Sequence, residues 1–286
     1  MASIRPVLAA LPIRRFRNPP PVVPVVRLEG VIARGRSARG QGMSLAELAG
    51  PIQKAFSMKD APAVALIINS PGGSPVQSAL IAGRIRELAE EKNKPVLGFV
   101  EDVAASGGYW LACAADEIFA DASSIVGSIG VIAATFGVND LIGRWGIERR
   151  VYTAGSRKMM LDPFQPEKED DVSRVKHLQE RIHRDFINHV EGRRADKLKG
   201  SPDDLFNGDI WVGSEAVDLG LIDGLGHLRP ILRERFGDKV KMKVFGQQRG
   251  FLRRFGLSDS RTMGQAAIGG AIDAVEERAH WQRYGL

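Results

Sequence analysis

Hydrophobic and polar positions alternate along this chain with two different periods. Short apolar runs rich in Val and Ile are followed by longer stretches in which apolar residues recur every three or four positions. The short runs predict buried strands and the longer stretches predict amphipathic helices. We expect strands at 22–28, 64–68, 95–100, 117–120, 128–132 and 148–152. Because helices separate most of these strands, the pattern indicates βαβ units and a mainly parallel sheet.

Two of the expected helices carry clear start signals. Ser44 is followed three residues later by Glu47, which predicts a capping box for a helix that runs to about Met58. Ser74 and Pro75 open the next helix, because proline suits the first helical turn. Both helices directly follow glycine-rich or proline-rich turns, so the strand-to-helix boundaries are well marked.

The chain divides into an arm, a body and a tail. Prolines at 19–21 and 24 end a basic arm at 1–21, which we expect to be flexible. The body, 22–248, contains the strands, a long charged helix at 167–194 and a helix–turn–helix at 213–226. The tail, 249–286, carries an amphipathic helix with one apolar stripe, made of Ile268, Ile272, Val275 and Ala279.

Charge is unevenly distributed over the 286 residues, whose net charge is +6. Residues 1–42 carry +7 and residues 229–286 carry +6, so the middle of the chain carries −7. Basic ends around an acidic middle argue against a nucleic-acid-binding domain, which concentrates positive charge on its folded face. Two interpretations of the basic ends stay open. They are solvated tails, or they bind anionic lipid or an acidic partner electrostatically.

Cysteine and hydropathy limit the class of protein further. Cys113 is the one cysteine, which excludes an intramolecular disulfide and a cysteine-rich metal site. No run approaches the roughly 18 apolar residues that a transmembrane helix needs. The apolar patch at 7–13 is short, contains Pro12 and precedes the nearest arginines, so it makes a poor signal peptide. We therefore expect an unexported protein.

Two glycine-bearing corners follow two successive strands. Pro71-Gly72-Gly73 comes after the strand at 64–68, and Ser106-Gly107-Gly108 comes after the strand at 95–100. In an open α/β sheet, ligands collect beyond the carboxyl ends of strands. A serine at a strand-to-helix corner has an exposed hydroxyl, and free amides there favour developing negative charge. The corner therefore predicts a nucleophilic serine.

A serine hydroxyl needs a base, and the sequence offers no obvious histidine. None of the five histidines lies in a corner or at a strand end near Ser106. A lysine held neutral by burial is the remaining candidate. Lys158 follows the expected strand at 148–152 and a glycine turn, and apolar residues follow it. The residues alone leave Lys158 as either a surface lysine or the base.

Three stretches, in order, carry a family resemblance. "INSPGGSPVQSA", "VAASGGYWLACAADEIFADASSIVGSIGVI" and "AGSRKMMLDPF" resemble the signal peptide peptidase A family, of SppA/SohB type, and "GDIWVGSEAVDLGLIDGLG" resembles its closing segment. The similarity covers about 22–232. That family consists of serine peptidases with a Ser–Lys dyad. The resemblance implies an α/β, ClpP/crotonase-like fold of repeated βαβ units with a mainly parallel sheet flanked by helices.

The resemblance also assigns roles to particular residues. It implies that Ser106 is the nucleophile, that Lys158 is the general base and that the Ser128 hydroxyl orients the lysine. It places the oxyanion donors at the amides of Gly73 and Gly107. No metal and no cofactor are implied. Relatives form rings, so we expect a homo-oligomer.

The expected function is a serine endopeptidase that cleaves signal-peptide remnants or other small or unfolded polypeptides through an acyl-enzyme. Many family members carry a transmembrane anchor where this chain has an arginine-rich arm. Peptides in the cytoplasm, or at the inner face of a membrane that the basic termini contact, therefore fit better as substrates. Two alternatives remain: a crotonase-type enzyme acting on acyl-CoA, and a non-catalytic scaffold of the same fold at a membrane. No nucleic-acid partner is expected.

Overall fold

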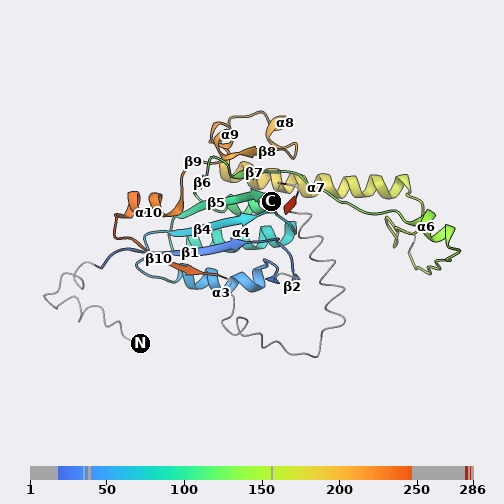
Figure 1. Ribbon diagram of the computed structural model, residues 1–286, viewed down its shortest axis with the longest axis horizontal. Coiled ribbons are helices and arrows are strands. Elements are labelled where there is room, and N and C mark those ends of the chain that lie inside the picture. The colour runs from blue at the N-terminus through green and yellow to red at the C-terminus, as the bar shows by residue number, and fades with distance from the viewer. Residues whose placement is uncertain are drawn as a thin grey trace, which may run out of the picture.

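The centre of the protein is an eight-stranded, mainly parallel sheet (Figure 1). The computed structural model describes residues 19–34, 36–37, 40–155, 157–246, 281–282 and 284. The main strand order is β10 (Lys241–Phe245), β1 (Val22–Glu29), β4 (Val64–Ser70), β5 (Val96–Ala105), β6 (Glu117–Ala120) and β9 (Gly224–Leu225), all parallel. Off this path, β7 (Ile125–Gly127) pairs parallel with β5, and β8 (Ile210–Val212) pairs antiparallel with β7. A separate antiparallel pair joins β2 (Arg36–Ser37) and β3 (Gly40–Gln41).

Helices cover both faces of this sheet. On one face lie α3 (Leu45–Phe56), α4 (Pro75–Glu91), α5 (Gly107–Ala112) and the long α7 (Glu169–Arg194), which share one hydrophobic core. On the other face, α10 (Leu228–Phe236) packs over a smaller core. Short helices α6 (Asn139–Arg144), α8 (Pro202–Leu205) and α9 (Gly213–Asp218) complete the described elements. The predicted α/β class, with a mainly parallel sheet flanked by helices, is confirmed.

The helix start signals in the sequence act as expected. The backbone amide and the hydroxyl of Ser44 both donate to one carboxylate oxygen of Glu47, at 3.2 and 3.0 Å, so the capping box forms at the start of α3. At the start of α4, the Ser74 hydroxyl accepts from the Gln77 amide at 3.4 Å, and Pro75 occupies the first turn. These caps fix where the chain leaves the glycine-rich turns.

The structure corrects three expected elements. The strand expected at 128–132 lies earlier, as β7, because Ser128 takes a positive φ and ends the extended run. The helix–turn–helix expected at 213–226 is a helix between short strands, α9 followed by β9, because Gly224 and Leu225 pair with β6. The strand expected at 148–152 is irregular chain, since none of the described strands pairs with it.

Residues 131–168, here called the projecting segment, extend away from the body at the N-terminal end of α7 (Figure 1). This segment contains α6 and the irregular chain on either side of it. Its large apolar side chains are mostly exposed: Ile132, Phe136, Leu141, Trp145, Ile147 and Tyr152. Inside the segment, the Val138 amide donates to the Pro163 carbonyl at 2.6 Å, and Arg149 pairs with Asp162 at 3.0 Å.

Parts of the predicted domain division lie outside the described residues. These parts are residues 1–18 of the N-terminal arm and residues 249–280 of the tail, which carry its apolar stripe. The division into arm, body and tail stays a prediction. In the part of the chain that the structure describes, we find no helix that combines the length and the apolar character needed to cross a membrane.

Candidate active site

Ser106 occupies a sharp corner between β5 and α5. Its φ of +52° lies in the left-handed region, which is uncommon for a residue with a side chain. Hydrogen bonds hold it there: the Ser106 amide donates to the Gly127 carbonyl at 2.8 Å, and the Ser106 carbonyl accepts from the amides of Tyr109 and Trp110. Strained backbone of this kind persists where the surrounding structure over-determines it, commonly at functional sites.

A bulge in β5 sets the direction of this corner. Residues 101–103 of β5 stand opposite the single residue Asn69 of β4, since Ile68 pairs with Val100 and Ser70 pairs with Ala104. The Asn69 side chain fills the bulge: its amide donates to Asp102 at 2.6 Å and its oxygen accepts from the Val103 amide at 3.3 Å. At this bulge β5 changes its partner from β6 to β7. Bulges bend strands and re-aim side chains, so this one turns Ser106 toward β7.

The second corner, Pro71-Gly72-Gly73, is locked to the loop that follows β1. The Gly72 carbonyl accepts from the Ile32 amide at 2.8 Å, and the Ile32 carbonyl accepts from the Ser74 amide at 2.7 Å. Gly73 has a φ of +139°, and a Cβ there would lie 2.1 Å from the Ile32 carbonyl oxygen. Only glycine can occupy this position without moving the backbone.

The two glycine corners meet. A Cβ on Gly72 would lie 2.8 Å from the Ser106 Cβ and 3.0 Å from the Gly107 amide nitrogen. A Cβ on Gly107 would lie 3.4 Å from the Gly73 amide nitrogen. Among the described residues, no oxygen accepts a hydrogen bond from the amide of Gly73 or of Gly107. Two unused backbone donors therefore lie close together beside the Ser106 side chain.

Ser128 also lies beside Ser106. Ala105 and Gly127 are paired residues at the ends of β5 and β7, so the two serines are the next residues of neighbouring parallel strands. Ser128 has the same positive φ, +52°, and its amide donates to the Asp209 carbonyl at 2.7 Å. The chain thus brings together four of the five residues that the sequence singles out, Ser106, Ser128, Gly73 and Gly107.

Lys158 is the exception. Its side chain is exposed in the projecting segment, and the nearby Leu161 amide donates to Asp171, in the first turn of α7, at 3.4 Å. Twelve residues further along α7, His183 contacts the Ile129 carbonyl, next to Ser128. At 1.5 Å per residue this separation is about 18 Å along the helix axis. No hydrogen bond or ion pair joins the described residues of the projecting segment to the Ser106 corner.

Two histidines lie closer to the corner than the sequence suggested. His183 Nε2 contacts the Ile129 carbonyl at 2.9 Å, and His189 Nε2 contacts the Trp110 carbonyl at 3.0 Å. The His189 ring also stacks on Trp110, and burial lowers the pKa of His189. Each Nε2 is occupied by a backbone carbonyl, so these rings hold α7 against the site. The residue in the sequence that could have indicated these contacts is Phe186. It is buried one turn from both histidines, on the helix face that packs against α5.

Other reactive side chains near the corner are packed away. Cys113 is fully buried, and burial raises the pKa of its thiol to about 12, so it stays protonated at neutral pH. The Tyr109 hydroxyl is buried and donates to the Leu221 carbonyl at 2.7 Å. Burial raises the pKa of Tyr109 well above its usual value. No cluster of His, Cys, Asp or Glu suited to a metal ion occurs among the described residues.

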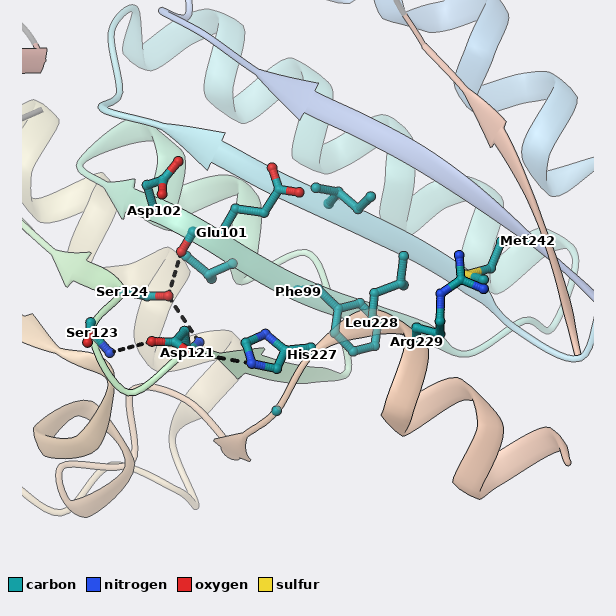
Figure 2. A pocket seen from close by; sticks show the side chains of 13 residues that line it. Phe99, Glu101, Asp102, Asp121, Ser123, Ser124, His227, Leu228, Arg229 and Met242 are labelled. Carbon is teal, nitrogen blue, oxygen red and sulfur yellow. Dashed lines mark hydrogen bonds and ion pairs between the residues drawn. The ribbon is translucent and has the colours of Figure 1, made fainter. Parts of the chain in front are cut away.

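A separate pocket of about 450 Å³ opens on the α10 face of the sheet (Figure 2). Phe99, Leu228 and Met242 contribute apolar walls. Asp121 accepts from the Ser123 amide at 2.9 Å and lies 3.4 Å from His227. None of the five predicted site residues lines this pocket. It is therefore distinct from the serine corner.

The sequence profile of peptidase family S49 matches residues 89–239, which is more than half of the chain. The chain belongs to peptidase family S49. The matched span contains Ser106, Ser128 and Lys158, whereas the Gly73 corner precedes it. The resemblance drawn from the motifs is thereby confirmed at the level of the family.

Similar proteins include recognised proteases. Protease 4 of Haemophilus influenzae is 32% identical over 215 residues, which cover 73% of this chain and 33% of that protein. The chloroplastic serine protease SPPA of Arabidopsis thaliana is 30% identical over 213 residues, 72% of this chain and 31% of that protein. A solved structure titled 1510-N membrane-bound stomatin-specific protease, an alanine-substituted form, overlays with a TM-score of 0.48 at 14% identity, over 81% of this chain and 100% of that one.

A protein of Brucella abortus bears a different name, Na(+)/H(+) antiporter NhaA. It is 55% identical over 282 residues, which are 96% of this chain but 38% of that protein. That name belongs to the Brucella protein, whereas residues 89–239 of this chain match a peptidase family. The chain spans 31% to 38% of these three relatives.

Proposed function

We propose that this chain is a serine endopeptidase in which Ser106 attacks a peptide carbonyl and Lys158 is the general base. The observation that supports this most directly is the meeting of the two corners. The Ser106 side chain lies beside two unused amides, those of Gly73 and Gly107. Such donors are what a carbonyl oxygen needs as it becomes an oxyanion.

The proposed reaction follows from these positions. Neutral Lys158 takes the proton of the Ser106 hydroxyl as the oxygen forms a bond to the peptide carbonyl carbon. The oxyanion accepts hydrogen bonds from the amides of Gly73 and Gly107. The C–N bond then breaks, the lysine returns the proton to the leaving amine, and an acyl-enzyme remains. Water, deprotonated by the same lysine, then attacks the acyl carbon, the C–O bond to Ser106 breaks, and the lysine returns the proton to the Ser106 oxygen. The Ser128 hydroxyl holds the lysine in place.

Within one chain Lys158 is far from Ser106, so we propose that a neighbouring copy of the chain supplies it. The projecting segment that carries Lys158 exposes a series of large apolar side chains, which a second copy would cover. This arrangement agrees with the expected homo-oligomer. It also explains why Lys158 is exposed in the single chain, since its burial would come only with assembly.

Two inactive variants test both parts of the proposal. Ser106→Ala and Lys158→Ala should each abolish cleavage of a fluorogenic peptide, while Lys168→Ala, at the edge of the same segment, should keep it. Mixing the two inactive variants after mild dissociation should restore activity. In a closed ring of identical contacts, random mixing leaves about one quarter of the sites with both groups.

The outcomes separate the two ideas. Substantial activity in either single variant contradicts the dyad itself. Inactive single variants that stay inactive after mixing contradict the contribution of a second copy. Fluorophosphonate labelling of Ser106, followed by mass spectrometry, adds a direct readout of the nucleophile.

The two alternatives have less support. A crotonase-type enzyme usually has acidic residues at its site, but Glu101, on the preceding strand, lines the separate pocket on the α10 face (Figure 2). A non-catalytic scaffold would not need unused amides beside a strained serine. We further propose that the substrates are peptides in the cytoplasm or at the inner face of a membrane, where the basic termini contact anionic lipid.

A further inference from the structure

The pocket on the α10 face of the sheet has no role in the proposed reaction (Figure 2). Its floor is apolar, because Ile67 and Phe99 are paired residues of β4 and β5 whose buried side chains share this face. Leu228, at the start of α10, packs against the same core. The volume of about 450 Å³ lies within the range of ligand pockets, roughly 300–1,000 Å³. The pocket can therefore bury an apolar side chain.

The pocket is elongated, because its lining crosses several strands of the sheet. The lining extends from the turn at 121–124, which follows β6, to Met242 on β10. Four strand spacings separate β6 from β10, and neighbouring strands lie about 4.8 Å apart, so the two ends are about 19 Å apart. An extended chain rises about 3.3 Å per residue. The pocket therefore matches about five or six residues of an extended peptide better than a compact small molecule.

The end of the pocket beside β6 is acidic. Asp102 has no lysine or arginine partner among the described residues, and Asp121 has only His227, at 3.4 Å. Glu101 adds a third carboxylate, but Arg27 already pairs with it at 2.6 Å. Two carboxylates thus remain available to a cationic group of a ligand.

The other end of the pocket carries an arginine. Figure 2 shows Arg229 and Met242 at the opposite end of the pocket from Asp102 and Asp121. No residue in the described part of the chain forms a hydrogen bond or an ion pair with the Arg229 side chain. A guanidinium group can donate two parallel hydrogen bonds to a carboxylate. Opposite charges at the two ends of an apolar groove favour a ligand with the complementary arrangement of charges.

We propose that this pocket is a second peptide-binding site, separate from the serine corner, and that its ligand is a peptide segment with opposite charges at its two ends. A lysine or arginine of the peptide binds Asp102 and Asp121. An apolar side chain of the peptide covers Phe99, and a carboxylate of the peptide binds Arg229. This binding needs no catalysis, so it is independent of the proposed Ser–Lys reaction. Because Asp102 precedes Ser106 by four residues, the bound peptide lies beside the strand that carries the nucleophile.

Isothermal titration calorimetry with a designed peptide measures the binding directly. The peptide is Lys-Ala-Phe-Ala-Glu with blocked ends, and the protein is the full chain with Ser106→Ala, which prevents cleavage of the peptide. We expect saturable binding that weakens about tenfold when the Phe of the peptide is replaced by Ala. Replacement of its Lys by Glu should weaken binding at least about tenfold. No saturation up to about 1 mM, or equal affinity for these peptides or for blocked phenylalanine alone, would overturn the proposal.

Matched charge variants in the same background locate the site. Asp121→Asn should weaken binding of the original peptide about three- to fivefold, whereas Asp238→Asn, at an exposed position outside the pocket, should leave it unchanged. Arg229→Gln should weaken binding about two- to fivefold. Arg233→Gln, one turn further along α10 and outside the pocket, should not. None of these four side chains is fully buried, so thermal unfolding should show intact folds.

A second peptide, with Gln in place of Glu, tests the orientation. It should bind Arg229→Gln and the unchanged pocket equally well, because it has no carboxylate for the arginine to bind. An effect of Arg229→Gln that is the same for both peptides contradicts the proposed contact. Equal losses in Asp121→Asn and Asp238→Asn would place the peptide elsewhere and overturn the proposal. Failure of the wild type to cleave peptides would overturn the proposed function and leave these binding results unaffected.

Discussion

The serine corner and the projecting segment carry two halves of the proposed dyad in opposite settings. Around the corner, the flanking residues Ala105 and Tyr109 are fully buried, and backbone hydrogen bonds hold Ser106 in a strained conformation. In the projecting segment, by contrast, Phe136 is 85% exposed and Tyr152 is 91% exposed. The body is thus complete in a single chain, whereas the segment has apolar surface without a partner among the described residues. Under the proposed function, the nucleophile is positioned by the body of a single chain, whereas the base reaches it only on assembly.

The largest effect on stability is expected in the body, at a buried ion pair behind the corner. The fully buried Arg194 donates to Asp223 at 2.6 Å and to the Gly220 carbonyl at 2.7 Å. Arg194→Met should cost about 3–5 kcal/mol in the free energy of unfolding, because the Gly220 carbonyl loses both hydrogen bonds from Arg194 and Asp223 loses its buried ion-pair partner, keeping only Lys197 and the Ile118 amide. Arg184→Met, at an exposed position of the same helix, is the control and should change stability by less than about 0.5 kcal/mol. Denaturant unfolding measures both changes. A small loss of stability for Arg194→Met would contradict the interpretation that the body is rigid in a single chain.

A somewhat smaller effect is expected at the glycine corner. Gly73→Ala would place a Cβ 2.1 Å from the Ile32 carbonyl oxygen at a φ of +139°, so the corner must shift. We expect a loss of about 2–4 kcal/mol, together with loss of peptide cleavage. Gly83→Ala is the matched control, since its Cβ would meet nothing within 4 Å on α4. The free energy of unfolding of that variant, measured by thermal unfolding, should rise by about 0.5–1 kcal/mol. Full activity in Gly73→Ala would show that this corner does not shape the site.

Acid should weaken the body through Asp223. Burial by itself raises the pKa of Asp223, but hydrogen bonds from Lys197, Arg194 and the Ile118 amide outweigh it and lower the pKa below its ordinary value. The folded protein therefore binds the Asp223 proton less tightly than the unfolded chain does. This contribution to stability is present above the ordinary carboxylate pKa of about 3.9 and is lost as the pH falls through the lowered value. The melting temperature of wild type should exceed that of Asp223→Asn at pH 7, and the gap should narrow below about pH 4. A constant gap would exclude this linkage.

The smallest effect on stability is expected in the projecting segment. Phe136→Ser and Trp145→Ser should change the free energy of unfolding by less than about 0.5 kcal/mol, because these side chains are already exposed. Both variants should shift the protein to smaller species in chromatography with light scattering. Val76→Ser, at an exposed apolar position of α4 on the body, is the control and should leave the mass unchanged. A wild type that is monomeric at micromolar concentration would remove the basis of this contrast.

Local pattern predicted most of the elements that build the corner. The capping box at Ser44 and Glu47, the proline start of α4 and the long α7 all follow from short-range sequence signals. The predicted strand at 148–152 failed for a physical reason. An extended run becomes a strand only when a neighbouring strand accepts its backbone hydrogen bonds, and the projecting segment has no such neighbour among the described elements.

The proximity of α7 to the candidate site could not be predicted from the sequence either. The sequence places His183 and His189 on the long charged helix and not in a corner near Ser106, yet both contact carbonyls next to that corner. The side of a helix that faces the body depends on packing with residues far away in the chain, here Trp110 and Ile129. To predict which side of α7 faces the body, one would have needed to know that Phe186 stacks on Trp110.

By itself, the sequence determined the two glycine corners, the serine at the second corner and the family, because these depend on residue types at short spacing. Only the tertiary structure decided that Gly73 lies beside Gly107, that Ser128 lies beside Ser106 and that Lys158 lies apart from them. Those relations depend on strand order and on the bulge opposite Asn69, which join segments far apart in the chain. Long-range pairing is a property of the whole sheet, and no short stretch of sequence contains it.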